Sequence, residues 1–208
     1  MQNLGLDALL CIFPDDAIAP ALKALRQEGF PILCAGLHKI SGVSCLFHDY
    51  KKENRKAVKL LASDRKRIML LLPESFPQEK EAIEGYLEGL SEVGLEFNKT
   101  LIVHENAGTP DELATLLATR KPDAIIFNGG IDCYWDLFKN NPELMESCML
   151  YGGALYIYDA MGYKGYVTSN LIENVACQAI DDLCAQMDGK SPSEPLCLPL
   201  PTKATLVR

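Results

Sequence analysis

Short apolar runs alternate along this chain with longer segments in which apolar residues recur at helical spacing. Residues 8–13 (ALLCIF) form a nearly unbroken apolar run, typical of a strand that is covered on both faces of a parallel sheet. Pro14 and two aspartates interrupt this run and provide an N-cap for a helix over residues 17–28, which Gly29 ends. The sequence therefore begins with a strand followed by a helix.

The same pattern repeats to the end of the chain. Further strands are predicted over residues 31–35, 43–47, 67–72, 100–104, 124–127 and 154–158. Helices are predicted over residues 51–63, 79–93, 110–119, 132–140 and 171–187, and an extended segment over 196–207. Regular alternation of this kind calls for an α/β protein, with parallel sheets flanked by helices. About eight strands are more than one small sheet usually holds, so we expect two packed lobes. Ligands of such folds bind outside the carboxyl ends of the strands.

Composition narrows the class of protein. The 208 residues carry a net charge of −8, so this part of the protein is expected to bind nucleic acid poorly. No apolar run approaches the ~18–20 residues of a membrane helix, and the first residues do not resemble a secretory signal. The eight cysteines form no C-x-x-C pair. We therefore expect a cytoplasmic protein whose cysteines are reduced, rather than a disulfide framework or a metal site.

The sequence provides little support for catalysis. His38, His48 and His104 lack the spacing of a zinc site. His48 and Asp49 are neighbours, and adjacent residues on an extended strand point in opposite directions, so they form no relay. Gly129-Gly130 follows a predicted strand, but neither phosphate-loop pattern is present. We predict no catalytic residue, no metal and no cofactor.

Motifs in three stretches, taken in order, resemble one protein family. The first stretch contains LDALL at 6–10, GFPIL at 29–33, and HDY at 48–50 leading to RKRI at 65–68, which are similar to "(V/I)DGII", "GIPVV" and "D…A…L…GHRRI". The second contains 82–94, similar to "RxxGFxxAL…GL", and KPDAII at 121–126, similar to "PDAI". The third runs from YIYD at 156–159 ("GYD") to LP at 198–199 and LVR at 206–208 ("LP…LVVR"). These motifs resemble the effector-binding core of LacI/GalR-type bacterial transcription regulators.

The resemblance implies a two-lobed, periplasmic-binding-protein-like fold of type I. Residues 1–64 and 163–190 would form the first lobe, which would be incomplete, and residues 65–162 and 191–208 the second. The family's DNA-binding headpiece, hinge helix and first β-α-β-α precede the position that matches Ala8, so the chain is expected to be truncated at its N-terminal end. The strand over 8–13 would then present an apolar edge that favours association.

The resemblance also implies partners. A small-molecule effector, of sugar type, would bind in the cleft between the lobes, and operator DNA would be bound only through the missing headpiece. A homodimer is expected, with a surface around residues 49–63 and 73–94, and no membrane contact. The alternatives are a stand-alone periplasmic-type solute-binding protein and, with least support, an α/β enzyme.

Three polar residues are candidate effector ligands. Asp159 matches the family's effector-binding acid, Asn128 matches an amide that contacts effector in some members, and Asn170 lies where such chains cross between lobes. The alternatives are a cap at Asp159, a turn at Asn128 and an N-cap at Asn170.

Two aromatic residues are candidates as well, and one family ligand is missing. Tyr134 and Trp135 are candidates for stacking on a sugar, although their helical spacing beside Leu137 also fits core positions. Ala82 stands where the family has an arginine that hydrogen-bonds to the ligand. Lys80 is the one nearby cation that could replace this arginine. The pocket is therefore expected to differ from the usual sugar pocket of the family.

Overall fold

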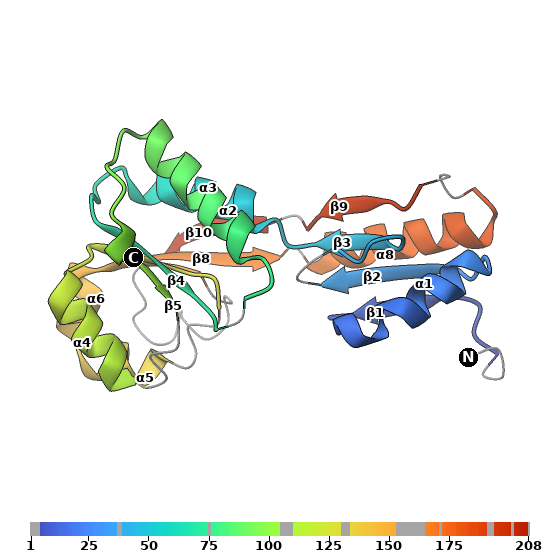
Figure 1. Ribbon diagram of the computed structural model, residues 1–208, viewed down its shortest axis with the longest axis horizontal. Helices are drawn as coiled ribbons and strands as arrows, with labels where there is room; N and C mark the ends of the chain where they lie inside the picture. Colours follow the sequence, from blue (N-terminus) through green and yellow to red (C-terminus); the bar gives the residue numbers. More distant parts are fainter. Residues whose placement is uncertain are drawn as a thin grey trace. The chain divides into compact units, whose positions relative to one another are not determined.

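The computed structural model of the protein describes residues 5–36, 39–74, 76–104, 110–129, 134–152, 165–170, 172–190, 194–200 and 202–207 (Figure 1). The chain divides into two compact units, each assembled from segments that are distant in sequence. Unit 1 comprises Met1–Asp49 and Asn170–Thr202, and unit 2 comprises Tyr50–Ser169 and Lys203–Arg208. The chain therefore crosses from one unit to the other at 49–50, 169–170 and 202–203.

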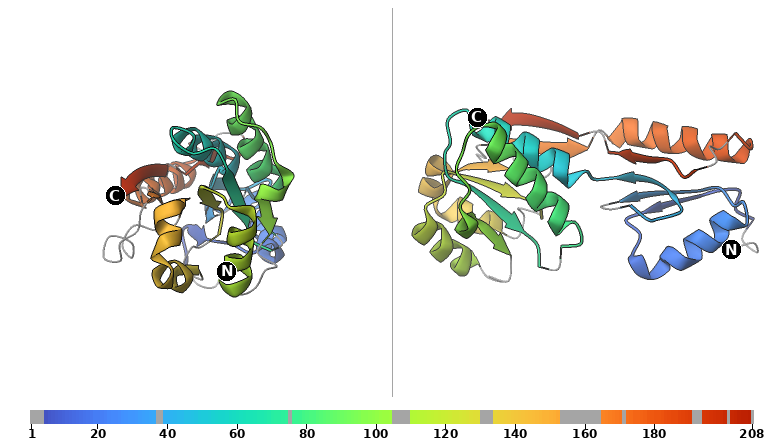
Figure 2. Two further views of the ribbon diagram at one scale, coloured as in Figure 1. Left: turned by 90° about the vertical axis from the view of Figure 1, so that its left-hand side faces the viewer. Right: turned by 45° about the horizontal axis from the view of Figure 1, so that its top comes forward.

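Unit 1 contains a parallel sheet with a helix on each face (Figure 2, right). Its strand order is β1-β2-β3-β9. The strands are β1 (Leu9–Ile12), β2 (Ile32–Gly36), β3 (Ser44–Phe47) and β9 (Cys197–Pro199). The 3-10 turn η2 (Asp16–Ile18) leads into α1 (Ala19–Gln27), and α8 is Ile172–Met187. Successive residues of β2 point to opposite faces: Cys34 packs with Leu22 of α1, and Leu33 packs with Ala179 of α8.

A glutamine of α8 provides hydrogen-bond partners for the backbone N–H and C=O groups at the start of β2. Oε1 of Gln186 accepts a hydrogen bond from the Ile32 N–H at 2.9 Å, and its Nε2 donates to the Ile32 carbonyl at 3.0 Å. Nε2 also donates to Oδ2 of Asp182 at 2.6 Å. All three residues are buried, so the side-chain amide takes the place of water for both backbone groups.

The substitution Gln186→Ala is expected to lower the free energy of unfolding by roughly 2–3 kcal/mol, because it leaves the buried N–H and C=O of Ile32 without partners. Chemical denaturation measures this change. Gln178→Ala is the matched control, since it makes the same substitution at a half-buried position of the same helix. Equal losses in the two variants would contradict a special role for Gln186.

Unit 2 contains a six-stranded sheet with helices on both faces, in the order β10-β8-β7-β6-β4-β5. The pairs from β8 to β5 are parallel. The strands are β4 (Ile68–Leu72), β5 (Ile102–His104), β6 (Ala124–Phe127), β7 (Met149–Tyr151), β8 (Gly165–Asn170) and β10 (Thr202–Val207). The helices are α2 (Tyr50–Leu61), α3 (Glu79–Glu92), α4 (Pro110–Arg120), α5 (Trp135–Asn140) and α6 (Pro142–Ser147), with the 3-10 turn η3 (Lys99–Leu101) before β5.

Strand β4 separates the two layers of the core of unit 2. Met69 and Leu71 pack in the cluster that includes residues of α4 and α5. Ile68, Leu70 and Leu72 point the other way, into the cluster formed with α2 and α3. All five residues are buried, as the unbroken apolar run predicted for a strand covered on both faces.

Helices α2 and α3 approach each other closely because α3 carries glycines at the contact. A Cβ added at Gly85 would overlap the carbonyl group of Lys51, and one at Gly89 would lie 2.7 Å from Cβ of Val58. Only glycine leaves enough space for the two backbones at Gly85.

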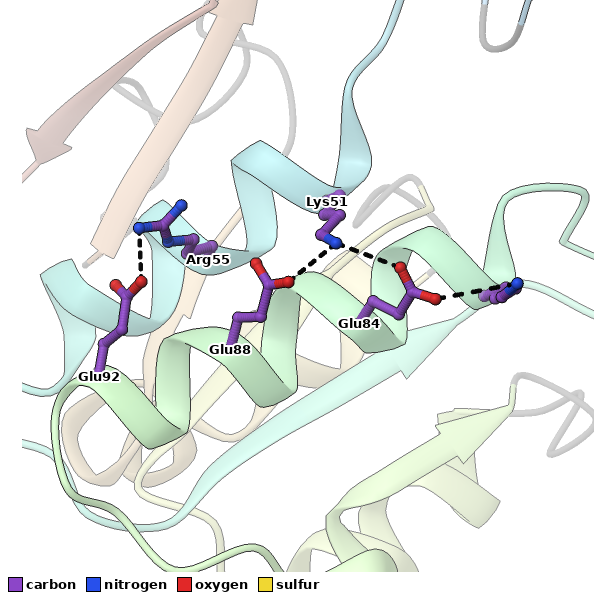
Figure 3. Close-up of polar contacts among 6 residues, drawn as sticks. Lys51, Arg55, Glu84, Glu88 and Glu92 are labelled. Carbon is purple, nitrogen blue, oxygen red and sulfur yellow. Dashed lines mark hydrogen bonds and ion pairs between the residues drawn. The ribbon is translucent and has the colours of Figure 1, made fainter.

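Exposed ion pairs line the same helix pair (Figure 3). Lys51 Nζ lies 3.3 Å from Glu84 and 2.8 Å from Glu88. The carboxylate of Glu92 forms ion pairs with both neighbouring cations: its Oε1 lies 2.5 Å from Nη2 of Arg55, and its Oε2 lies 2.6 Å from Nζ of Lys59. Hydrogen bonds from Lys59 and Arg55 hold the pKa of Glu92 below its usual value. Because these pairs are solvent-exposed, each adds little stability, and the glycine contact determines the helix spacing.

The observed division of the chain differs from the predicted one at α2. The prediction placed the helix over 51–63 in the first lobe, whereas α2 belongs to unit 2. Ala57, Val58 and Leu61 of α2 pack in one cluster with β4 and α3, which explains the assignment. The return crossing also comes at 169–170 rather than near residue 163, and the last crossing comes at 202–203 rather than near residue 190.

The predicted strands and helices are otherwise present wherever the structure describes the chain. Among the described elements, α6, β7 and β8 were not predicted, and η3 occupies the start of the strand predicted over 100–104. The strand predicted over 154–158 lies outside the described residues. The predicted helix over 132–140 is described from Trp135 onward.

Candidate functional site

The carboxyl ends of the strands of unit 2 bring polar side chains together. Asn128 follows β6 directly, and Tyr151 is the last residue of β7. The first turns of α2 place Glu53 and Asn54 against them. In parallel sheets this edge is where ligands bind, so these residues form the candidate site.

The amides of Asn54 and Asn128 form a reciprocal pair of hydrogen bonds. Nδ2 of Asn54 donates to Oδ1 of Asn128 at 2.7 Å, and Nδ2 of Asn128 donates to Oδ1 of Asn54 at 2.9 Å. Nδ2 of Asn54 also donates to the carbonyl oxygen of Ala82 at 3.0 Å. Asn54 is 1% exposed and Asn128 is half-buried. The pairing therefore holds the Asn128 amide in one orientation at the end of β6.

A buried carboxylate lies beside the amide pair. Glu53 is 6% exposed, and its Oε2 accepts a hydrogen bond from the Tyr151 hydroxyl at 3.1 Å. The ring of Tyr151 in turn lies 6.2 Å from the ring of Tyr166, centroid to centroid. A buried carboxylate is costly unless hydrogen bonds compensate for lost water, and the phenol provides one.

Two further groups lie at this edge. The ring of Tyr50 packs edge-to-face on Phe76 at 4.7 Å, and burial raises the pKa of Tyr50 to about 12, which keeps its hydroxyl neutral. Gln78, just before α3, is buried, and its Oε1 has no hydrogen-bond partner in the described part of the chain. A buried acceptor without a partner is unusual in a folded protein.

Among the residues predicted from the sequence, Asn128 and Tyr134 have described side chains. Asn128 belongs to the candidate site. Tyr134 is buried in the core, with its ring 6.3 Å from that of Phe127 and packed among residues of α4 and α5. This position agrees with the core alternative for Tyr134.

The side chains of the other three predicted residues lie outside the described part of the structure. Asp159 lies outside the described residues. Asn170 ends β8 and Trp135 begins α5, and both side chains lie outside the described part of the structure.

The arginine missing at position 82 has no substitute nearby in α3. Ala82 is fully buried, and its carbonyl oxygen accepts the hydrogen bond from Asn54. The side chain of Lys80 is 84% exposed and lies 4.0 Å from Glu84. Lys80 therefore points to solvent and pairs with its own helix.

Glu53 and Asn54 were not recognised from the sequence, although a signal was present. The buried face of α2 consists of Tyr50, Glu53, Asn54, Ala57, Val58 and Leu61. Their spacing is that of a single helical stripe, so two polar residues occupy positions that the pattern reserves for apolar ones. Polar residues on such a stripe need buried partners, which Tyr151, Asn128 and the Ala82 carbonyl provide.

A separate cleft of about 590 Å³ lies at the opposite edge of the sheet, where β4 and η3 begin. It is lined by Lys66, Arg67, Glu96, Phe97, Asn98, Lys99 and Leu101. The guanidinium of Arg67 is engaged by the carbonyls of Arg120 and Lys121, at the end of α4. This cleft is distinct from the candidate site.

The described residues contain no group of three or more His, Cys, Asp or Glu side chains that could hold a metal ion. None of the described helices has both the length and the apolar character needed to span a membrane.

Comparisons with known proteins identify the fold. No family model matches the chain, and no curated protein matches its sequence. Among solved structures, the transcriptional regulator CelR in complex with cellobiose matches with a TM-score of 0.73 and 20% identity, over 97% of this chain and 65% of that one. The regulator CcpA of Lactococcus lactis matches with a TM-score of 0.74 and 18% identity, over 98% of this chain and 78% of that one.

A regulatory protein of the LacI family from Chloroflexus aggregans also matches, with a TM-score of 0.72 and 17% identity, over 100% of this chain and 77% of that one. The chain thus spans 65% of the length of CelR and somewhat more of the others. Likeness at this level of identity establishes the fold. The protein has the α/β, periplasmic-binding-protein-like fold of LacI-family transcription regulators, and the predicted fold class is confirmed.

Proposed function

We propose that this chain is the effector-sensing part of a transcriptional regulator, which binds a small polar molecule and catalyses no reaction. The observation that carries the proposal is the match of nearly the whole chain to transcriptional regulators, one of them in complex with the disaccharide cellobiose. The net charge of −8 disfavours contact between this chain and DNA phosphates, so DNA contact is assigned to another part of the regulator.

The candidate site supports a neutral, hydroxyl-bearing effector. Its described groups are amides, a phenol and one carboxylate that is already hydrogen-bonded, and this edge carries no arginine at position 82. Such groups match the alternating donors and acceptors of sugar hydroxyls, whereas a phosphate or carboxylate ligand calls for a guanidinium or ammonium.

Asp159, Asn128 and Asn170 are the proposed polar ligands, with Trp135 as the aromatic surface for the sugar ring. Tyr134 fits a supporting role, because it is buried beneath the end of β6 against Phe127. Effector binding would favour one of two conformational states of a cytoplasmic homodimer, and thereby change its affinity for operator DNA.

The test is thermal unfolding of the chain in the presence of pentoses, hexoses, disaccharides, sugar phosphates and nucleobases. A ligand at about 100 times its dissociation constant should add ~2.7 kcal/mol of stability and raise the midpoint of unfolding visibly. Neutral sugars are expected to give the largest shift.

Asp159→Ala is expected to abolish that shift while leaving the unfolding midpoint without ligand unchanged. Asp181→Ala, at an exposed position of α8, is the matched control and should retain the full shift. The proposal fails if no compound in the panel shifts the midpoint. The assignment of Asp159 fails if Asp159→Ala binds the active compound with wild-type affinity.

A further inference from the structure

Four cysteines lie side by side across the sheet of unit 1. In the strand register, Cys11 of β1 is opposite Cys34 of β2, and Cys34 is opposite Cys45 of β3. Cys45 is opposite Cys197 of β9. Residues in register across a parallel sheet point to the same face, so these side chains form one row, which we call the thiol row.

The thiol row runs from the interior to the surface. Cys34 and Cys45 are buried beneath α1, in the same apolar cluster as Leu22. Cys197 lies at the outer edge of the sheet and is exposed. In the strand register Cys45 stands between Cys34 and Cys197, so Cys45 connects the interior of the row to its exposed end.

Cys45 and Cys197 are directly opposite each other on paired strands. Strands that pair in a sheet lie about 4.8 Å apart, which falls within the ~4.4–6.8 Å between the Cα atoms of bonded cysteines. β9 is three residues long and pairs with β3 on one side only. A short edge strand can make the small adjustment that brings the two sulfurs into bonding distance, whereas β2 is held between two neighbours.

We propose that Cys197 and Cys45 are the site of a reversible oxidation, in which a peroxide converts the two thiols to a disulfide. The exposed Cys197 thiolate attacks one peroxide oxygen and becomes a sulfenic acid, with release of one water when hydrogen peroxide is the oxidant. The Cys45 sulfur then attacks the sulfenic sulfur, the S–O bond breaks, and the hydroxyl leaves as a second water. Two thiols are thereby oxidised by two electrons, and one hydrogen peroxide is reduced to two waters.

The rate of this reaction depends on how readily Cys197 loses its proton. Burial of part of the side chain and the neighbouring Cys45 thiol raise the pKa of Cys197, and the Lys39 ammonium lowers it, with a net rise. Thiolate is the reactive form, so oxidation is slow at neutral pH and becomes faster as the pH rises toward the pKa.

The disulfide would join two strands that lead to crossings between the units. β3 ends at Phe47, just before the crossing at 49–50, and β9 ends at Pro199, just before the crossing at 202–203. A bond between Cys45 and Cys197 would covalently link β3 and β9 shortly before the chain leaves unit 1 at each crossing. This role is independent of effector binding, and its test needs no effector.

The experiment treats the reduced full chain with hydrogen peroxide at mildly alkaline pH, blocks the remaining thiols by alkylation, and maps disulfides by mass spectrometry of a non-reduced digest. We expect a linked pair of peptides that contain Cys45 and Cys197, lighter by two hydrogen atoms and separated by dithiothreitol. The linked pair should be lost in Cys197→Ser. It should form at the wild-type yield in Cys184→Ser, which removes an exposed thiol of α8 in the same unit.

Cys197 is exposed, so Cys197→Ser is expected to melt at the same temperature as the wild type, and loss of the linked pair cannot then be attributed to unfolding. Three results would overturn the proposal. These are Cys197 recovered only as sulfinic or sulfonic acid, a bond from Cys45 to Cys34 in place of Cys197, and a linked pair found only between two chains.

Discussion

Gly85→Ala is expected to destabilise the protein by about 3 kcal/mol or more. The new Cβ would overlap the carbonyl group of Lys51, which is backbone and has no rotamer to move aside. Alanine gains ~1 kcal/mol of helix propensity over glycine, but this gain is smaller than the cost of moving α2 away from α3. Urea denaturation followed by far-UV circular dichroism measures the change.

Two variants in the same helix calibrate this prediction. At Gly89 the new Cβ meets the Val58 side chain at 2.7 Å and the Arg55 carbonyl at 3.1 Å, so Gly89→Ala should cost less, roughly 1–2 kcal/mol. Ser91→Ala, at an exposed position of α3, should change stability by no more than ~0.5 kcal/mol. If Gly85→Ala were as stable as Ser91→Ala, α2 and α3 could not be as close as described.

Asn54→Ala is expected to lower the free energy of unfolding by roughly 2–4 kcal/mol. The substitution removes both hydrogen bonds to Asn128 and the bond to the Ala82 carbonyl, and each buried group left without a partner costs about 1–3 kcal/mol. Asn128→Ala leaves the bond to Ala82 in place and acts at a half-buried residue, so its cost should be lower, about 1–2 kcal/mol.

A double-mutant cycle isolates the amide pair. The sum of the two single losses of unfolding free energy should exceed the loss in the double variant Asn54→Ala/Asn128→Ala by about 1–2 kcal/mol. Each single variant already breaks the shared hydrogen bonds, so the sum counts them twice. Asn140→Ala, an exposed residue of α5, is the control and should be nearly neutral. Strictly additive losses would show that the two amides do not interact.

The buried strands were predictable because they lie in parallel sheets with helices on both faces. Such strands are apolar at every position, so β2, β4 and β6 were located within one residue of their observed ends. β8 (GYVTSN) mixes small, polar and aromatic residues, and β7 is three residues long, so neither presents a run that stands out from a loop.

Periodicity has a second limit, which α2 demonstrates. The apolar stripe of a helix identifies the face that is buried, but not the sheet that the face covers. The division between units 1 and 2 therefore could not be located from the stripe of α2. In the candidate site, Asn128 was identified from the family resemblance, whereas its partner Asn54 depends on a contact between residues 74 positions apart, which no local pattern records.

The order in which the segments of unit 1 occur in the chain has a consequence for biosynthesis. β1, β2 and β3 are complete at Phe47, but α8, which covers Leu33 and Leu46, begins only at Ile172. At a translation rate of ~5–20 residues per second, the ribosome needs roughly 6–25 s to supply it. During that interval one apolar face of the nascent sheet has no helix of its own, while most of unit 2 is already emerging. The nascent chain therefore offers chaperones a binding surface over residues 9–47 until residues 172–187 have been made.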